Sequence, residues 1–173
     1  ATNAASTADI AITITGAAGA EPEDETVPRT VAGSSLIDWN SGISVNNAGL
    51  GAITIDADAD ISAREYGVNV VQNNALNAEG IDVTVTGDIE AENAVYVQNY
   101  GTATSAIDLT FGGAVTSTGG NAIEVVGQGN LDLTTNGAVT ANSVTEQDPD
   151  GPSGPLEPEV TGGSAISVDL ALG

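Results

Sequence analysis

Carboxylates recur at one position in three similar stretches of the sequence. Asp82, Asp108 and Asp132 each lie between two aliphatic residues, in the stretches 81–83, 107–109 and 131–133. If these stretches align, the three aspartates form a column of like charges, and such a column destabilises a ladder of strands. A hard divalent cation with oxygen ligands, such as Ca²⁺, would reverse that effect. We therefore predict a weak Ca²⁺ ladder here; the competing interpretation is a row of solvated carboxylates.

Three further aspartates, Asp56, Asp58 and Asp60, alternate with alanine. Alternation with a period of two places all three on one face of a strand, and it is not the spacing of an EF-hand loop. We expect these residues to extend the predicted Ca²⁺ ladder at one end.

Catalysis has few candidate residues in this chain. There is no His and no Cys, and the only two cationic side chains are Arg29 and Arg64. This composition excludes Ser-His-Asp and Cys-His nucleophile systems. Paired carboxylates one strand apart lie nearer the spacing of a retaining glycosidase than that of an inverting one. We expect a non-catalytic protein, and a β-helix that binds or cleaves polysaccharide is the alternative.

The net charge indicates which classes of binding partner are disfavoured. Twenty-four acidic residues against two arginines give a formal charge of −22, which argues against nucleic acid and anionic membranes. No run of 18 apolar residues occurs, so the sequence predicts no membrane insertion. The first residue is Ala, as after removal of a signal peptide or in an expressed fragment.

A three-part phrase of short alternating segments is repeated five times along the chain. Alternation of apolar and polar residues predicts half-buried strands, and Gly and Asn between them predict corners. The first segments are 12–14, 53–55, 81–83, 107–109 and 131–133; the second are 60–63, 88–91, 114–117 and 138–141; the third are 42–45, 67–70, 94–97, 122–125 and 165–168.

Repeats of three strands and about 25 residues, with no helical period, predict a parallel β-helix. We expect one all-β domain over residues 1–173, a right-handed β-solenoid of about five coils. Inward side chains would stack in files, for example Ile81, Ile107 and Leu131. The alternative, a β-sandwich, should show two-residue hairpin turns and no fixed three-part order.

Two acidic segments, residues 20–40 and 142–163, interrupt the repeat and contain all six prolines. We predict that both are loop insertions between the second and third strands of their coils, leaving the solenoid at the same corner. Insertions on a solenoid gather on one edge, which is often a working surface.

Four large aromatic residues stand outside the predicted core: Trp39, Tyr66, Tyr96 and Tyr100. Flat aromatic rings anchor interfaces and stack on sugars, so these residues are candidates for ligand or partner contact. For Trp39 the alternative role is structural, holding down its own loop.

The two ends of the repeat array carry no polar cap. Ile10, Ile12 and Ile14 begin a strand almost at once, and residues 165–172 alternate to the last position but one. Uncovered strand edges invite pairing with another chain. We expect either a slice of a longer solenoid or copies that stack head to tail into filaments, through an assembly set that comprises Ile10, Ile12, Ile14, Ile166, Val168, Leu170 and Leu172.

The repeat itself is similar to that of a known class of proteins. Residues 81–101 and 107–127, of the pattern I-x-V-T-V-T-G followed by A-I-x-V-x-N-x-G, resemble the passenger domains of autotransporters and related adhesin-like secreted proteins of Gram-negative bacteria. The resemblance excludes the two insertions. It implies secretion by a Gram-negative bacterium to the cell surface or the medium, and a structural or adhesive role such as in a biofilm matrix, with polysaccharide or a host surface as a further partner.

Overall fold

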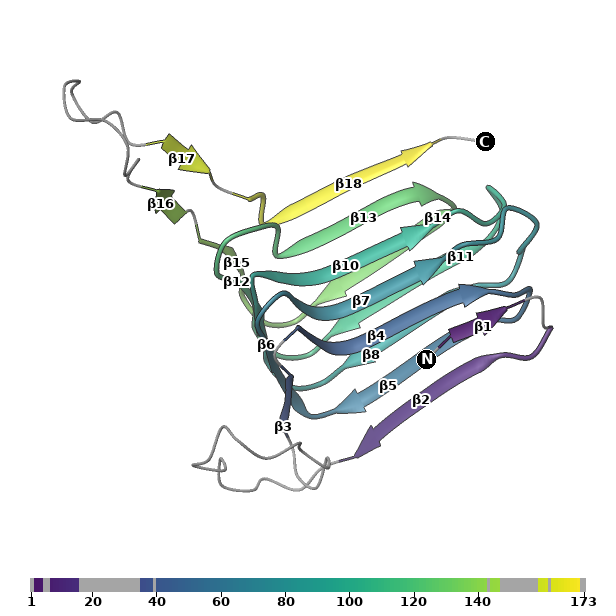
Figure 1. Cartoon of the computed structure of the whole chain (residues 1–173), viewed down its shortest axis with the longest axis horizontal. Helices are drawn as coiled ribbons and strands as arrows, with labels where there is room; N and C mark the ends of the chain where they lie inside the picture. The colour runs from purple at the N-terminus through teal and green to yellow at the C-terminus, as the bar shows by residue number, and fades with distance from the viewer. Residues whose placement is uncertain are drawn as a thin grey trace.

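The computed structural model describes residues 2–4, 7–15, 35–38, 40–142, 144–146, 159–161 and 163–171. These residues form strands and connecting corners (Figure 1). Within these ranges no helix is long and apolar enough to cross a membrane.

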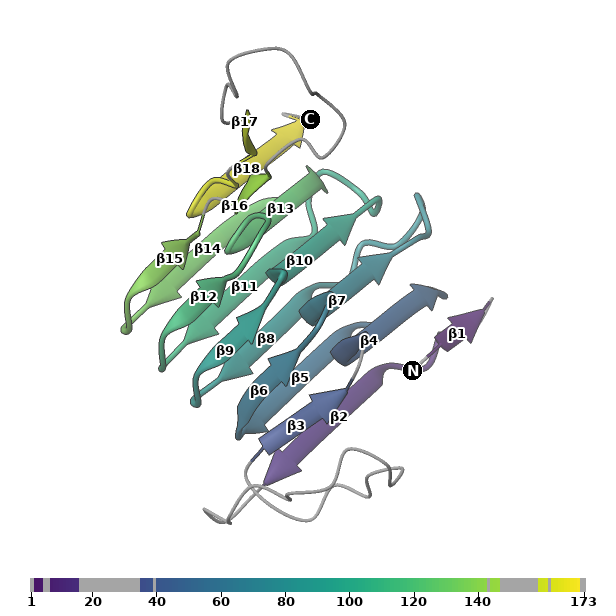
Figure 2. The same ribbon diagram turned by 60° about the vertical axis from the view of Figure 1, so that its left-hand side comes forward.

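Three parallel sheets wrap around one core, and each gathers strands from successive repeats. Sheet A has the order β1 (Thr2–Ala4), β4 (Ser41–Ala48), β7 (Tyr66–Gln72), β10 (Asn93–Asn99), β13 (Ile123–Gln128) and β18 (Ile166–Ala171). Sheet B contains β2 (Ile10–Thr15), β5 (Ile53–Asp58), β8 (Ile81–Val85), β11 (Ala106–Phe111) and β14 (Asn130–Thr135). Sheet C, seen as one row in Figure 2, contains β3 (Ser35–Asp38), β6 (Asp60–Ala63), β9 (Ile89–Ala91), β12 (Val115–Ser117) and β15 (Val139–Ala141).

The chain passes from sheet B to sheet C to sheet A and then returns to sheet B one level higher. This path confirms the predicted right-handed β-solenoid, the hand that parallel crossovers take (Figure 1). The chain makes about four complete turns from β2 to β14, slightly fewer than the five coils expected, and β15 and β18 then complete a fifth level of strands. The three sheets contain only parallel pairs, so the sandwich alternative is wrong.

The core consists of aliphatic files that run along the solenoid axis. Ile81, Ile107 and Leu131 are successive neighbours, as the sequence predicted. Because every second residue of a strand points inward, each strand adds two or three side chains to these files. Side chains in the middle coils are almost fully buried, for example Val83, Val97 and Leu109. No single coil could bury its own inward face, so each coil depends on its neighbours.

Two details of the first coil differ from the sequence prediction. Ile10, not Ile12, is the neighbour of Ile53, so the alignment by sequence places this strand two residues too late, although on the correct face. The segment 20–40 also contains a strand of the solenoid, since β3 pairs with β6. The first interruption therefore precedes the second strand of its coil, and the two insertions do not leave the same corner.

The second insertion has a structured base. Within residues 142–163, β16 (Val144–Glu146) and β17 (Glu159–Thr161) pair as an antiparallel hairpin. The hairpin leaves the solenoid between β15 of sheet C and β18 of sheet A (Figure 1).

Candidate functional site

The column of aspartates exists as predicted. Asp82, Asp108 and Asp132 are successive neighbours on the outer face of sheet B, and all three side chains are exposed. Neighbouring strands lie about 4.8 Å apart, which is close enough for repulsion. Among the described residues, however, no group of three acidic side chains is arranged to hold one metal ion. Ca²⁺ binding therefore stays a prediction, in which an ion would bridge neighbouring carboxylates in pairs.

The other predicted metal ligands have different surroundings. Asp56 lies beside Thr13 and Thr84 in the ladder. Asp58 accepts a hydrogen bond of 2.6 Å from the hydroxyl of Thr86. These two residues lie on β5, whereas Asp60 begins β6 of another sheet, so Asp60 does not continue their row.

Three carboxylates tie the corners of successive coils together. Asp60 accepts a hydrogen bond from the backbone N–H of Asp88 at 2.9 Å, and Asp88 accepts one from Ala114 at 2.7 Å. Asp9 accepts one from Ala52 at 2.8 Å. The role of these side chains is structural, because each satisfies a corner N–H that the ladder leaves unpaired. A sequence pattern marks these carboxylates, although the repeat analysis above does not include it: each one directly precedes an isoleucine that points inward.

Buried amides fix the corners at the other end of the sheet A strands. The side chain of Asn47 donates to the carbonyl of Gly51 at 2.7 Å, and that of Asn77 donates to the same carbonyl at 2.9 Å. Asn99 accepts from the N–H of Gly101 at 2.8 Å. Gln72 stands between Asn47 and Asn99 in the ladder, and both polar atoms of its buried amide lack a partner.

Two of the four predicted aromatic contact residues, Tyr66 on β7 and Tyr96 on β10, come together, and Tyr100 directly follows β10. The rings of Tyr66 and Tyr96 have centroids 5.9 Å apart with an interplanar angle of 57°. The hydroxyl of Tyr100 accepts a hydrogen bond from Gln98 at 2.7 Å. Burial, and then the carboxylate of Glu124, raise the pKa of Tyr96 above its usual value. Trp39 lies outside the described residues.

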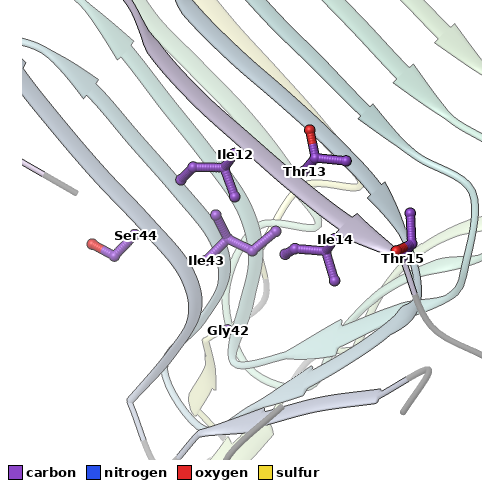
Figure 3. Close-up of a pocket in the computed structure, with 7 residues that line it drawn as sticks. All are labelled: Ile12, Thr13, Ile14, Thr15, Gly42, Ile43 and Ser44. Carbon is purple, nitrogen blue, oxygen red and sulfur yellow. The ribbon is translucent and has the colours of Figure 1, made fainter. Parts of the chain in front are cut away.

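The N-terminal end of the solenoid is hollow between sheets A and B. Figure 3 shows the side chains of Ile12, Ile14 and Ile43 around this space. The hollow has a volume of about 440 Å³, and its remaining lining residues are Thr13, Thr15, Gly42 and Ser44. On this edge the described strands pair with β4 only over Asn46–Ala48, through β1, so no described strand lies beside Ile43 and Val45.

The C-terminal end exposes apolar side chains. Ile166 and Val168 of β18 are 46% and 48% exposed, whereas the two residues before Val168 in its file, Val97 and Val125, are fully buried. Leu131, Leu133 and Leu170 complete an apolar edge that is only partly covered. Six of the predicted assembly residues lie on β2 or β18, which are outermost strands of sheets B and A, and Leu172 lies outside the described residues.

Among the described residues, these features define a β-solenoid with corner-fixing carboxylates, a pair of packed tyrosine rings and a last strand, β18, with exposed apolar side chains. No family model matches the chain, and comparisons with curated proteins and with solved structures find no match.

Proposed function

We propose that this protein is a non-catalytic structural or adhesive subunit, secreted by a Gram-negative bacterium, that assembles end to end into filaments on the cell surface or in the surrounding matrix. The observation that carries this proposal is the match between the two ends of the solenoid. A hollow lined by isoleucines lies at one end, and exposed Ile166 and Val168 lie at the other.

The hydrophobic effect supplies a driving force for this contact. Complete burial of one aliphatic side chain stabilises by about 1.5–3 kcal/mol. Ile166 and Val168, which are already about half covered, would each contribute roughly 1 kcal/mol of that amount. The outermost strands of the three sheets would add backbone hydrogen bonds where they pair across the junction.

The charges on the outer surface are compatible with stacking. If the ladder of sheet B continued into a second copy, Asp132 would meet Ala11, because Ala11 occupies the first level of that column. In sheet A, Ser167 would meet Ser44 at the corresponding junction. The acidic columns therefore stop at the junction, which avoids the like-charge pairs that oppose association.

Substitution of Val168 by Asp tests the assembly. The carboxylate would be buried without a partner at the junction, at a cost of several kcal/mol, so the concentration needed for association should rise by about tenfold or more. Sedimentation velocity measures this concentration, and electron microscopy shows the filaments. Thr116→Asp adds the same charge to β12, away from both ends, and should assemble like the parent. Equal assembly of all three proteins would contradict the proposal.

A second candidate function is polysaccharide binding by the tyrosine cluster. The rings of Tyr66 and Tyr96 pack together, Tyr100 accepts a hydrogen bond from Gln98, and the carboxylate of Glu124 lies close enough to Tyr96 to raise its pKa. Aromatic rings and amides suit a neutral glycan, and the net charge of −22 disfavours an anionic one.

Calorimetry with a neutral β-linked glucan hexasaccharide tests this candidate function. Tyr96→Ala should weaken binding by about tenfold, since a hot-spot aromatic contributes on the order of 1–2 kcal/mol. Thr116→Ala on sheet C is the matched control and should bind as the parent does. Absence of binding by the parent protein would contradict this candidate function. If the parent protein instead cleaves the glycan and Asp108→Asn abolishes the cleavage, the protein is an enzyme.

A further inference from the structure

Large apolar and aromatic side chains are exposed at two places among the described residues. Two of them, Ile166 and Val168, lie on β18. The other three lie on successive connections from sheet A to sheet B: Leu50 follows β4, Leu76 follows β7 and Tyr100 follows β10. We call these three residues the corner triplet. The connections that carry them lie on the right of Figure 1, beyond the arrowheads of β4, β7 and β10, and belong to neighbouring coils.

Hydrogen bonds between neighbouring coils hold the connections that carry the triplet. The buried side chain of Asn77 donates to the carbonyls of Gly49 and Gly51, which flank the first member of the triplet, at 3.1 and 2.9 Å. The backbone carbonyl of Asn77 accepts the N–H of Thr102, on the third connection, at 2.8 Å. The side chain of Leu76 nevertheless stays 80% exposed, so the fold does not use its apolar surface. A row of exposed apolar side chains on fixed connections marks an interaction surface.

The corner triplet lies in a part of the surface that has little charge. The connections that follow β4, β7, β10 and β13 are residues 49–52, 73–80, 100–105 and 129. They contain one charged residue, Glu79. Asp9, on the connection before β2, already accepts the N–H of Ala52. The outer faces of the sheets carry carboxylates, for example exposed Asp108 on sheet B and Glu90 on sheet C. The two acidic insertions interrupt the other two corners, between β2 and β3 and between β15 and β18.

The charge distribution favours a second copy of the chain as the partner of this corner. Two molecules with a formal charge of −22 repel each other, and most ways of placing them side by side bring carboxylates together. Two corners that face each other bring together apolar side chains and almost no charge, so this arrangement has the least like-charge repulsion.

The size of the triplet indicates when such a contact would form. Three side chains cover much less than the roughly 800 Å² per partner that a stable interface buries, so isolated monomers should not pair in this way. In a filament the triplets of successive copies form one continuous row. Each contact then raises the effective concentration of the next, and many weak contacts add up to a stable association.

We propose that the corner triplets of one filament pack against those of a second filament, so that filaments of this protein associate laterally in pairs along the corner between sheets A and B. This inference rests on the proposed end-to-end assembly and adds a second contact surface between copies. The carboxylates of the sheet faces and the acidic insertions point to a limit of two filaments, because like charges oppose association at the other surfaces.

Substitution of Leu76 by Asp tests the lateral contact. The new carboxylate would face like charges and apolar side chains across the contact, so the mass per unit length of the filaments, measured by scanning transmission electron microscopy, should fall twofold. Thr116→Asp adds the same charge to β12 on sheet C and should leave the filaments paired. Because Leu76 is 80% exposed, the melting temperature of Leu76→Asp should match that of the parent, which separates loss of pairing from loss of folding.

Leu50→Asp extends the test to a neighbouring coil. If the whole row makes the contact, this variant should also give single filaments. Pairing of the parent should strengthen as salt rises, because salt screens the repulsion between the flanking carboxylates and leaves the apolar contact in place.

The outcomes separate the inference from the proposed function. Single filaments from the parent, or equal mass per unit length in the parent and both corner variants, would overturn lateral pairing and leave end-to-end assembly standing. If the corner variants stay paired but lose binding of the neutral glucan, the corner is a glycan site and lateral pairing is wrong. Absence of filaments from the parent would overturn the proposed function, and lateral pairing with it.

Discussion

At the level of single residues, the outward columns of the solenoid turn a repeat in sequence into a row of neighbouring charges. Asp108 stands between Asp82 and Asp132 on the outer face of sheet B. Other carboxylates, such as Asp88, instead accept a backbone hydrogen bond at a corner. Carboxylates of the same type therefore have opposite effects, because a corner position supplies a donor and the middle of a strand supplies only like charges.

We predict that Asp108→Asn stabilises the solenoid. The change removes two like-charge contacts, each worth a few tenths of a kcal/mol, up to about 1 kcal/mol. The melting temperature at low ionic strength should therefore rise, and the difference should shrink as salt screens the parent protein. Calorimetry at two salt concentrations measures both effects.

The same variant tests the predicted Ca²⁺ ladder. If Ca²⁺ bridges this column, millimolar Ca²⁺ should raise the melting temperature of the parent more than that of Asp108→Asn, with Mg²⁺ at equal concentration as the control. Equal shifts in the two proteins would show that the carboxylates are only solvated.

At the level of strands, the period of the repeat is enough to locate most of the fold. Apolar alternation predicts the strands of the second to fifth coils, and the recurring phrase predicts their order in three parallel sheets. Alternation determines which face of a strand is buried. A shift of the strand register by two residues keeps the same face buried, so alternation does not fix the register. That freedom explains why the sequence aligns Ile12 where Ile10 belongs.

The remaining differences from the sequence prediction have a local cause. The four residues of β3 stand after a long interruption, so no segment of the phrase directly precedes them to mark them as a strand. The shared register between β3 and β6 becomes visible only when the sheet forms. The sequence likewise predicts the tyrosines as separate contact residues, because the contact between the Tyr66 and Tyr96 rings arises only when β7 and β10 pair.

At the level of the whole molecule, a solenoid derives its stability from contacts between neighbouring coils. Each inner coil has two neighbours and each end coil has one, so stability should fall toward both ends. The file that contains Val45 follows this rule at one end only: Val70, Val97 and Val125 are fully buried, and Val168 is 48% exposed. The C-terminal coil is therefore the one that gains most from another layer.

Hydrogen exchange should show this gradient and its change on assembly. In the monomer, amides of β8 and β11 should exchange slowest, and those of β2, β14 and β18 fastest, because local opening starts where contacts are fewest. In filaments, β18 should gain protection on the order of tenfold or more, since its edge becomes paired. Uniform protection along the monomer would show that the coils open as one unit, and protection of β18 that stays unchanged in filaments would show that this strand is not at the junction.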